Sequence, residues 1–197
     1  FKDKVAGLLC GDGGSATIVE KIDHDNPTYF SLNSDGGGSR IIWIKGGGYR
    51  HPSSAETLRE KEYEDGSIRS DEQVVVDVAG FFDFASSEIT ADMVGIFEYA
   101  GENYEAIDFY LLHQADKSLN DQIAKKMKIP DDKLPYSIHK FGNTSSVSIP
   151  LSMVSEIRDE LQQGKNRLFL SGFGAGLSWA SAITSTNRCL IPKLVEI

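Results

Sequence analysis

Three stretches of the sequence place residues capable of acid–base or hydrogen-bonding chemistry directly after apolar runs. His113 ends the apolar run 107–112, Asn143 follows the run 136–141, and Gly172, Gly174 and Gly176 follow the run 167–171. In an open α/β sheet, ligands bind beyond the carboxyl ends of the strands. An imidazole at the edge of a dry interior also has a pKa within reach of neutral pH. The pattern therefore predicts one site where these three strand ends meet.

Each of these residues also has a purely structural interpretation. His113 could be satisfied by a backbone carbonyl, and Asn143 could be a helix cap or a turn residue. Spacing leaves both alternatives open. The glycines form Gly-x-Gly-x-Gly and precede a strand-like segment instead of a helix, which argues against dinucleotide binding.

The two cysteines, Cys10 and Cys189, lie far apart and lack metal-ligand spacing. We expect neither a disulfide framework nor a zinc site, and no cofactor is indicated. Cys10 ends the apolar run 5–10, so it is expected to be a small buried residue. The other histidines, His24, His51 and His139, are expected to be solvated or locally paired.

Apolar spacing along the chain alternates between strand and helix periods. The pattern predicts strands over residues 5–10, 16–22, 29–33, 107–112, 136–141, 167–171 and 177–184. It predicts helices over 78–99, from 116 to Pro130, and over 147–161, with a polar surface excursion at 36–71. This order predicts a single α/β domain with a mixed, mainly parallel sheet and helices packed on it.

The chain carries 20 lysines and arginines against 29 aspartates and glutamates, a net charge of −9 without a basic stripe, which argues against a nucleic-acid partner. No apolar run is long enough to cross a bilayer, and the first residues lack a signal-peptide core, so a cytoplasmic protein is expected. The first residue is phenylalanine, and we expect the chain to be part of a longer protein.

Four motifs occur along the chain in a fixed order. They are Gly11-Asp12-Gly13, His113-Gln114-Ala115, Gly142-Asn143-Thr144-Ser145-Ser146 with Ser148-Ile149-Pro150-Leu151, and Gly172-Phe173-Gly174-x-Gly176-Leu177-Ser178-Trp179. In this order they resemble the C-terminal half of 3-oxoacyl-[acyl-carrier-protein] synthase III.

The resemblance implies a thiolase-like fold, with residues 1–197 as the C-terminal domain of a condensing enzyme. It also implies a Cys-His-Asn triad in which His113 and Asn143 match the histidine and the asparagine. The nucleophilic cysteine belongs to the N-terminal half, and Cys10 stands where the family usually has phenylalanine. The isolated chain is therefore expected to be inactive.

For the complete protein, the resemblance implies condensation of an acyl group from acyl-CoA with malonyl-acyl carrier protein in fatty acid biosynthesis. It assigns Gly172, Gly174, Gly176 and Asp116 to substrate binding and implies a homodimer. Lys125 and Lys126 match basic positions near the carrier-protein docking surface.

Asp116 departs from the family, whose usual run is His-Gln-Ala-Asn. Its carboxylate could alter thioester recognition, or it could cap the following helix. Two alternatives to fatty acid synthesis stay open: a related acyltransferase of polyketide or specialised-lipid synthesis, and a non-catalytic partner subunit with the same fold.

Overall fold

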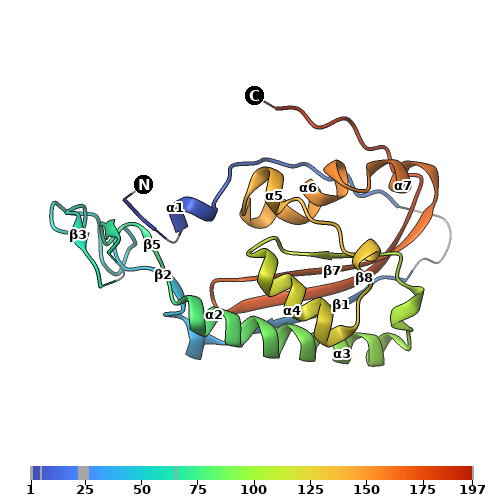
Figure 1. The fold of residues 1–197 in the computed structure, drawn as a ribbon, viewed down its shortest axis with the longest axis horizontal. Helices are drawn as coiled ribbons and strands as arrows, with labels where there is room; N and C mark the ends of the chain where they lie inside the picture. Colours follow the sequence, from blue (N-terminus) through green and yellow to red (C-terminus); the bar gives the residue numbers. More distant parts are fainter. Residues whose placement is uncertain (1, 5, 22–26, 65, 197) are drawn as a thin grey trace.

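A four-stranded mixed sheet with helices on both faces forms the body of the protein (Figure 1). The computed structural model describes residues 2–4, 6–21, 27–64 and 66–196. The strands run in the order β1-β8-β7-β6, from Tyr29–Ser34, Ser178–Asn187, Lys165–Gly174 and Phe109–Leu112. Only the β6–β7 pair is parallel, because β1–β8 and β7–β8 pair antiparallel. The mixed sheet is confirmed, but most of its pairing is antiparallel.

The sheet separates two apolar layers. On one face, β6 and β7 contribute Tyr110, Leu112 and Phe169 to the larger cluster, against α3 (Thr90–Ala100) and α4 (Lys117–Met127). On the other face, Leu111 and Leu168 pack with Ile157 and Leu161. Alternate side chains of a strand point to opposite faces, so a strand covered on both faces is apolar almost throughout, as residues 107–112 predicted.

The predicted helix over 78–99 is confirmed with an irregularity near Ser86 and Ser87. It consists of α2 (Val78–Phe84), a π-helical segment (Ala85–Ile89) and α3. The hydroxyls of Ser86 and Ser87 donate to the Asp83 carbonyl, and such side-chain bonds compete with the regular ladder.

The predicted strands at 5–10 and 16–22 are wrong. Residues Ala6–Leu9 form the one-turn helix α1, because the Asp3 carboxylate accepts from the Ala6 N–H at 2.9 Å and so caps the turn. Residues 11–21 form no regular element, and no strand in the described part of the chain pairs with them. Val5 and Ile22, at the ends of these two predictions, lie outside the described residues.

Two further predictions near the site differ from the structure. Residues 136–141 contain the short helix α5 (Ile138–Phe141) instead of a strand. The single helix expected at 147–161 divides into α6 (Ser148–Ser155) and α7 (Arg158–Gln163). In α6, the hydroxyls of Ser152 and Ser155 donate to carbonyls four residues back, which weakens helix continuity.

The polar excursion at 36–71 is confirmed as an elaboration beside the body (Figure 1). It carries a 3-10 turn at Gly36–Gly38 and the short strands β2 (Ile42–Ile44), β3 (Lys61–Glu62) and β4 (Ile68–Arg69). Strand β2 pairs antiparallel with β5 (Val74–Val76), which leads into α2. No helix in the described part of the chain is long and apolar enough to cross a membrane.

Candidate active site

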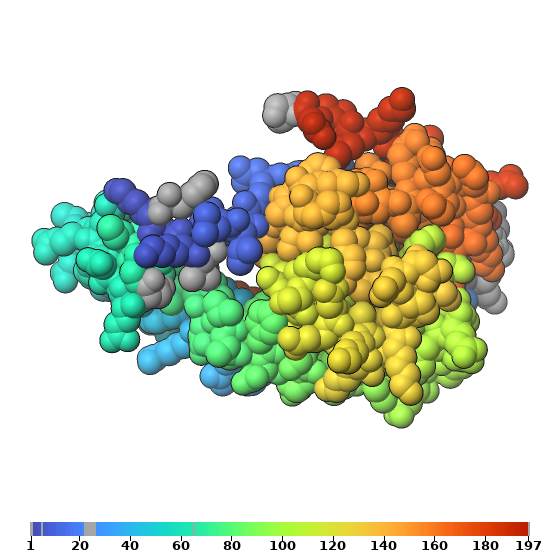
Figure 2. Space-filling model, in the orientation of Figure 1, coloured from blue at the N-terminus to red at the C-terminus, as the bar shows by residue number. Residues whose placement is uncertain are grey.

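An open pocket of about 690 Å³ lies where α1, α2, the carboxyl end of β6 and the start of α6 meet. Figure 2 shows the hollow between the N-terminal residues, α2 and the α5–α6 region. His113, Asn143, Asp116, Gly172 and Gly174 all line this pocket, so the structure brings together five of the residues that sequence singled out. Apolar side chains make most of the remaining wall, among them Ile42, Val74, Val76, Phe81, Phe82, Phe173 and Trp179.

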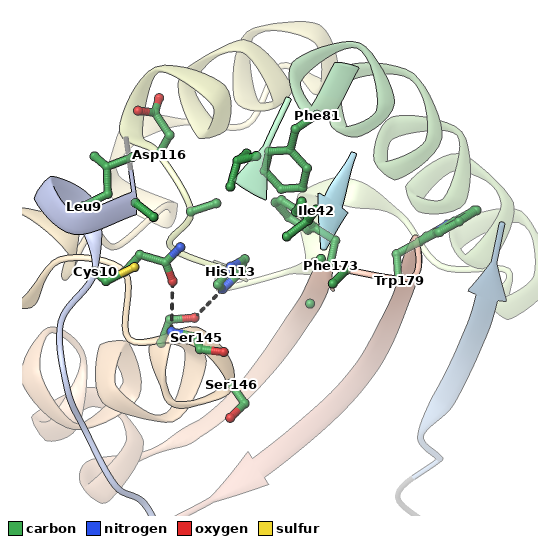
Figure 3. A pocket seen from close by; sticks show the side chains of 18 of the residues that line it. Leu9, Cys10, Ile42, Phe81, His113, Asp116, Ser145, Ser146, Phe173 and Trp179 are labelled. Carbon is green, nitrogen blue, oxygen red and sulfur yellow. Dashed lines mark hydrogen bonds between the residues drawn. The ribbon is translucent and has the colours of Figure 1, made fainter. Parts of the chain in front are cut away.

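His113 is held at the carboxyl end of β6 by the parallel pairing with β7. Its backbone N–H donates to the Ser171 carbonyl at 2.8 Å, and its ring Nδ1 lies 2.7 Å from Ser148 Oγ. The imidazole meets the Phe173 ring edge-on, with centroids 5.4 Å apart (Figure 3). The ring orientation is therefore fixed by contacts on two sides.

Burial lowers the pKa of His113 to about 4, although the Ser145 backbone works in the opposite direction. Transfer out of water penalises the charged imidazolium more than the neutral ring. At neutral pH the pocket therefore contains an uncharged imidazole, which has one N–H donor and one acceptor nitrogen.

Asn143 is fixed through both its backbone and its side chain. Its N–H donates to the Leu9 carbonyl at 2.7 Å, and its carbonyl accepts from the Gly11 N–H at 2.9 Å. Its side-chain Oδ1 accepts from the Ser145 N–H at 2.9 Å. Asn143 therefore has the predicted turn role. Because its Oδ1 is used in this turn, the amide NH₂ is the part of the side chain that can donate to another partner.

Glycine is required beside Asn143 because the two chain segments approach closely. Gly142 has φ +67°, and a Cβ there would lie 2.7 Å from the Leu9 carbonyl oxygen. A Cβ on Gly11 would lie 1.9 Å from the Phe141 carbonyl oxygen. The Gly11 and Gly142 motifs therefore serve the contact between the N-terminal segment and α5.

Cys10 is exposed, and the expectation that it is a buried small residue is wrong. Because residues 6–9 form a helix, Cys10 does not enter the sheet, and its backbone pairs instead with Asn143. Cys10 lines the same pocket as His113 (Figure 3).

Asp116 serves as the cap of α4, one of the two roles considered for it. Its Oδ1 accepts from the Leu119 N–H at 3.1 Å and from the Ser118 hydroxyl at 2.5 Å. Asp116 also lines the pocket, at a position apart from His113 in Figure 3. The capping contact and the pocket position are compatible.

Three other predicted site residues lie elsewhere. Gly176 belongs to the turn between β7 and β8 and is not among the pocket residues. Lys125 and Lys126 are exposed in the last turn of α4, and Lys126 Nζ donates to the Ser86 carbonyl at 2.8 Å. Of the other histidines, His51 and His139 are exposed, and His24 lies outside the described residues.

Sequence reasoning missed the buried residues behind His113, above all Gln114. The Gln114 amide donates to the Leu112 carbonyl at 2.9 Å, and its Oε1 accepts from the Ser137 and Ile138 N–H groups at 3.2 and 3.3 Å. It thereby pairs N–H groups at the start of α5, which explains why this segment is helical. A fully buried glutamine has no periodic signal, although its position next to His113 was visible.

Among the described residues, no group of three or more histidines, cysteines, aspartates or glutamates is arranged to hold a metal ion. The polar side of the pocket instead presents an imidazole, an amide and hydroxyls. Such a set can donate hydrogen bonds to an oxygen on which negative charge develops.

The chain is similar to known proteins over nearly all of its length. Residues 97–186 match the family model described as 3-Oxoacyl-[acyl-carrier-protein (ACP)] synthase III C terminal. Over these residues the chain is similar to the C-terminal domain of this synthase III family. The resemblance expected from the four motifs is therefore confirmed.

Curated relatives agree with the synthase III assignment. The beta-ketoacyl-[acyl-carrier-protein] synthase III of Synechococcus sp. (strain WH7803) is 30% identical over 93% of this chain and 52% of its own length. The protein of that name from Streptococcus thermophilus (strain ATCC BAA-491 / LMD-9) is 31% identical over 93% of this chain and 53% of its own length. The chain thus spans about half the length of the curated relatives it matches.

Solved synthase III structures confirm the thiolase-like fold. The 3-oxoacyl-(acyl-carrier protein) synthase from Burkholderia xenovorans LB400 superposes with a TM-score of 0.78 at 30% identity, over 88% of this chain and 48% of that one. The Thermus thermophilus synthase III superposes with a TM-score of 0.77 over 95% of this chain and 55% of its own, at 24% identity, and adds support for the fold alone.

Proposed function

We propose that residues 1–197 are the C-terminal domain of a condensing enzyme that joins an acyl group from acyl-CoA to malonyl-acyl carrier protein. The convergence of His113 and Asn143 on one apolar-walled pocket carries this proposal. The similarity to proteins named as synthase III supports the reaction class. Because those relatives are about twice as long, the rest of the active site would come from residues outside this sequence.

In the proposed reaction, a cysteine thiolate outside this chain attacks the acyl-CoA carbonyl and expels the CoA thiolate, which leaves a thioester on the enzyme. The malonyl group of the carrier protein then loses CO₂, and the electron pair of the broken C–C bond forms an enolate. The enolate carbon attacks the thioester carbonyl, the new C–C bond forms, and the cysteine thiolate leaves. The product is a 3-oxoacyl-carrier protein.

His113 and Asn143 would stabilise the enolate by donating hydrogen bonds to its oxygen. The arrangement suits this role because Asn143 Oδ1 is already occupied by the Ser145 N–H, which turns the NH₂ group toward other partners. The uncharged His113 ring can donate through the nitrogen that does not face Ser148. Donors fixed in a pocket of low polarity require little reorganisation as charge develops.

The proposal also places Gly172, Gly174 and Asp116 beside the substrate thioester, since all three line the pocket. Gly176 would act indirectly, by shaping the β7–β8 turn. Lys125 and Lys126 are exposed on α4 and would attract an acidic carrier protein. We further infer that the complete protein is a homodimer. We also infer that it is cytoplasmic, because its two free cysteines suit a reducing compartment.

The test uses the native protein, purified from its source with an antibody raised against this chain. Its intact mass should be well above 21.6 kDa, and it should release CO₂ from malonyl-carrier protein and form a 3-oxoacyl product. A native species of 21.6 kDa, or condensation by the isolated chain, would contradict the half-site proposal.

Variants of the same native protein test the two donors. Replacement of His113 or Asn143 by alanine should each lower kcat by about 10²- to 10³-fold, the usual loss for a donor of this kind. His139→Ala, which changes an exposed imidazole on α5, is the matched control and should keep full activity. Unchanged activity in His113→Ala would overturn the assignment.

A further inference from the structure

Ser148, the first residue of α6, lies directly behind the His113 ring. Its side chain is fully buried, and its Oγ is 2.7 Å from His113 Nδ1. The ring nitrogen that does not face Ser148 is Nε2; the ring also has a hydrogen bond with the Ser145 backbone, and it lines the pocket. Ser148 itself therefore acts on the pocket through His113.

The hydrogen-bond partners of Ser148 indicate where its proton goes. Its Oγ accepts from the Gln114 backbone N–H at 3.3 Å. Within the part of the chain that the structure describes, His113 Nδ1 is the one recorded partner of this hydroxyl that can accept a proton. A buried hydroxyl that donates to nothing is costly, so a bond from Ser148 O–H to Nδ1 is the direction that satisfies this hydroxyl.

We propose that Ser148 is a positioning residue, whose hydroxyl donates to His113 Nδ1 and thereby keeps the ring proton on Nε2. This inference rests on the proposed function, in which Nε2–H donates to the enolate oxygen. With the opposite tautomer, Nε2 would present a lone pair and repel that oxygen. The titratable groups that share the pocket with the ring are Cys10 and Asp116.

Buried neighbours hold Ser148 itself in place. Ser152 Oγ donates to the Ser148 carbonyl at 2.9 Å and lies 2.7 Å from Ser137 Oγ, and Ser137 is bonded through its N–H to Gln114. Ser148, Ser152, Ser137 and Gln114 are each no more than 1% exposed. This network fixes the serine before any substrate is present.

Nitrogen-15 NMR of the 197-residue chain, labelled at histidine, reads the tautomer directly. At pH 7 the His113 signals should show a protonated, pyrrole-type Nε2 and an unprotonated, pyridine-type Nδ1. The His113→Gln variant identifies these signals by their loss. A pyrrole-type Nδ1 in the unaltered chain would overturn the proposal, and this measurement needs no variant of Ser148 to fold.

A matched pair of serine variants separates positioning from general packing. Ser148→Ala should give a mixture of tautomers and raise the His113 titration midpoint by about one pH unit, because the bond that favours the neutral ring is lost. Ser155→Ala removes another hydroxyl from the same helix, one that bonds to the Leu151 carbonyl and Glu156 and not to His113 or Ser148, and it should leave both readings unchanged. Equal shifts in the two variants would contradict the proposal.

In the native enzyme, Ser148→Ala should lower kcat about tenfold, the loss of one hydrogen bond, with KM unchanged. The two proposals fail in different ways. An Nε2–H tautomer together with full activity in His113→Ala would reject the proposed function alone. An Nδ1–H tautomer together with an inactive His113→Ala would reject the role of Ser148 alone.

Discussion

The two walls of the pocket differ in how they are supported. The wall that carries His113 rests on a fully buried network of Gln114, Ser137, Ser148 and Ser152. The facing wall is formed by Ala6, Leu9 and Cys10, of which Leu9 is 42% exposed. The segment that continues from this wall exposes Ile18 and Val19 still more, at 94% and 89%. One wall is thus complete within this chain, and the other leaves apolar surface uncovered.

The contrast shows that one side of a site can be held by its own hydrogen-bond network while apolar side chains on the other side are still exposed. Contiguous exposed apolar residues mark surfaces that pack against something else. The N-terminal segment touches the organised wall through the short pairing of Leu9 and Gly11 with Asn143. Variants that act on either wall, or on the pairing between them, can therefore test the comparison.

The largest effect is expected from Gln114→Leu. This change leaves the buried Ser137 and Ile138 N–H groups without their acceptor and should lower the free energy of unfolding by about 4 kcal/mol. Urea unfolding of the chain measures the loss. Gln122→Leu, on the exposed face of α4, should change stability by less than about 0.5 kcal/mol. A loss below about 1 kcal/mol for Gln114→Leu would show that the network does not support this wall.

Stability should fall as the pH is lowered from about 6.5 to about 4. The folded pKa of His113 is about 4, below the ordinary value of 6.5, so the unfolded chain binds a proton in this window that the folded chain does not. The contribution is fully present above pH 6.5 and amounts to about 3 kcal/mol. Urea unfolding at several pH values measures it.

The control for this pH dependence is His113→Gln, which has no imidazole at the position. In this variant, the unfolding free energy should depend less on pH, because the contribution of His113 is gone while the contributions of the other titrating groups remain. An identical slope in the variant and the unaltered chain would mean that His113 titrates normally, and its wall would then be open to water.

Gly11→Ala should separate the two walls at their pairing. The added Cβ would lie 1.9 Å from the Phe141 carbonyl oxygen, so residues 9–11 must move away from Asn143. Hydrogen exchange of the Asn143 amide, which donates to the Leu9 carbonyl, should become about tenfold faster or more, a change of about 1.4 kcal/mol in local stability.

A second glycine provides the matched control for that experiment. Gly14 lies three residues further along the same segment, and a Cβ there would meet nothing within 4 Å. Gly14→Ala should leave the exchange of Asn143 unchanged. If both variants accelerate exchange equally, the close approach at Gly11 is not what joins the walls.

The smallest effect is expected in the exposed segment that continues from the uncovered wall. Val19→Ser changes a side chain that is 89% exposed and should alter the unfolding free energy of the isolated chain by less than about 0.5 kcal/mol. Urea unfolding of this variant measures the difference. A loss above about 1 kcal/mol would mean that the segment packs against the body, and the two walls would no longer differ as described.

Elements whose pattern is local can be predicted from the order of the amino acids alone. The continuously apolar β6 and the helical spacing of α3 and α4 follow from side-chain periodicity. Position at strand ends also singled out His113, Asn143 and the glycine loop, and the order of four motifs indicated the family. In each case the signal lies within a few residues of the feature that it predicts.

Features that depend on distant partners become visible only in the folded chain. Residues 138–141 are helical because Gln114, 24 residues before Ile138, accepts at the start of α5. Cys10 is exposed because its segment pairs with Asn143 instead of a strand. Ser148 faces the imidazole because β6 and α6 bring together residues that are 35 positions apart. The exposure of Cys10 and the hydrogen-bond partners of Gln114 and Ser148 depend on residues that are distant in the sequence, so a local pattern of residue types does not contain them.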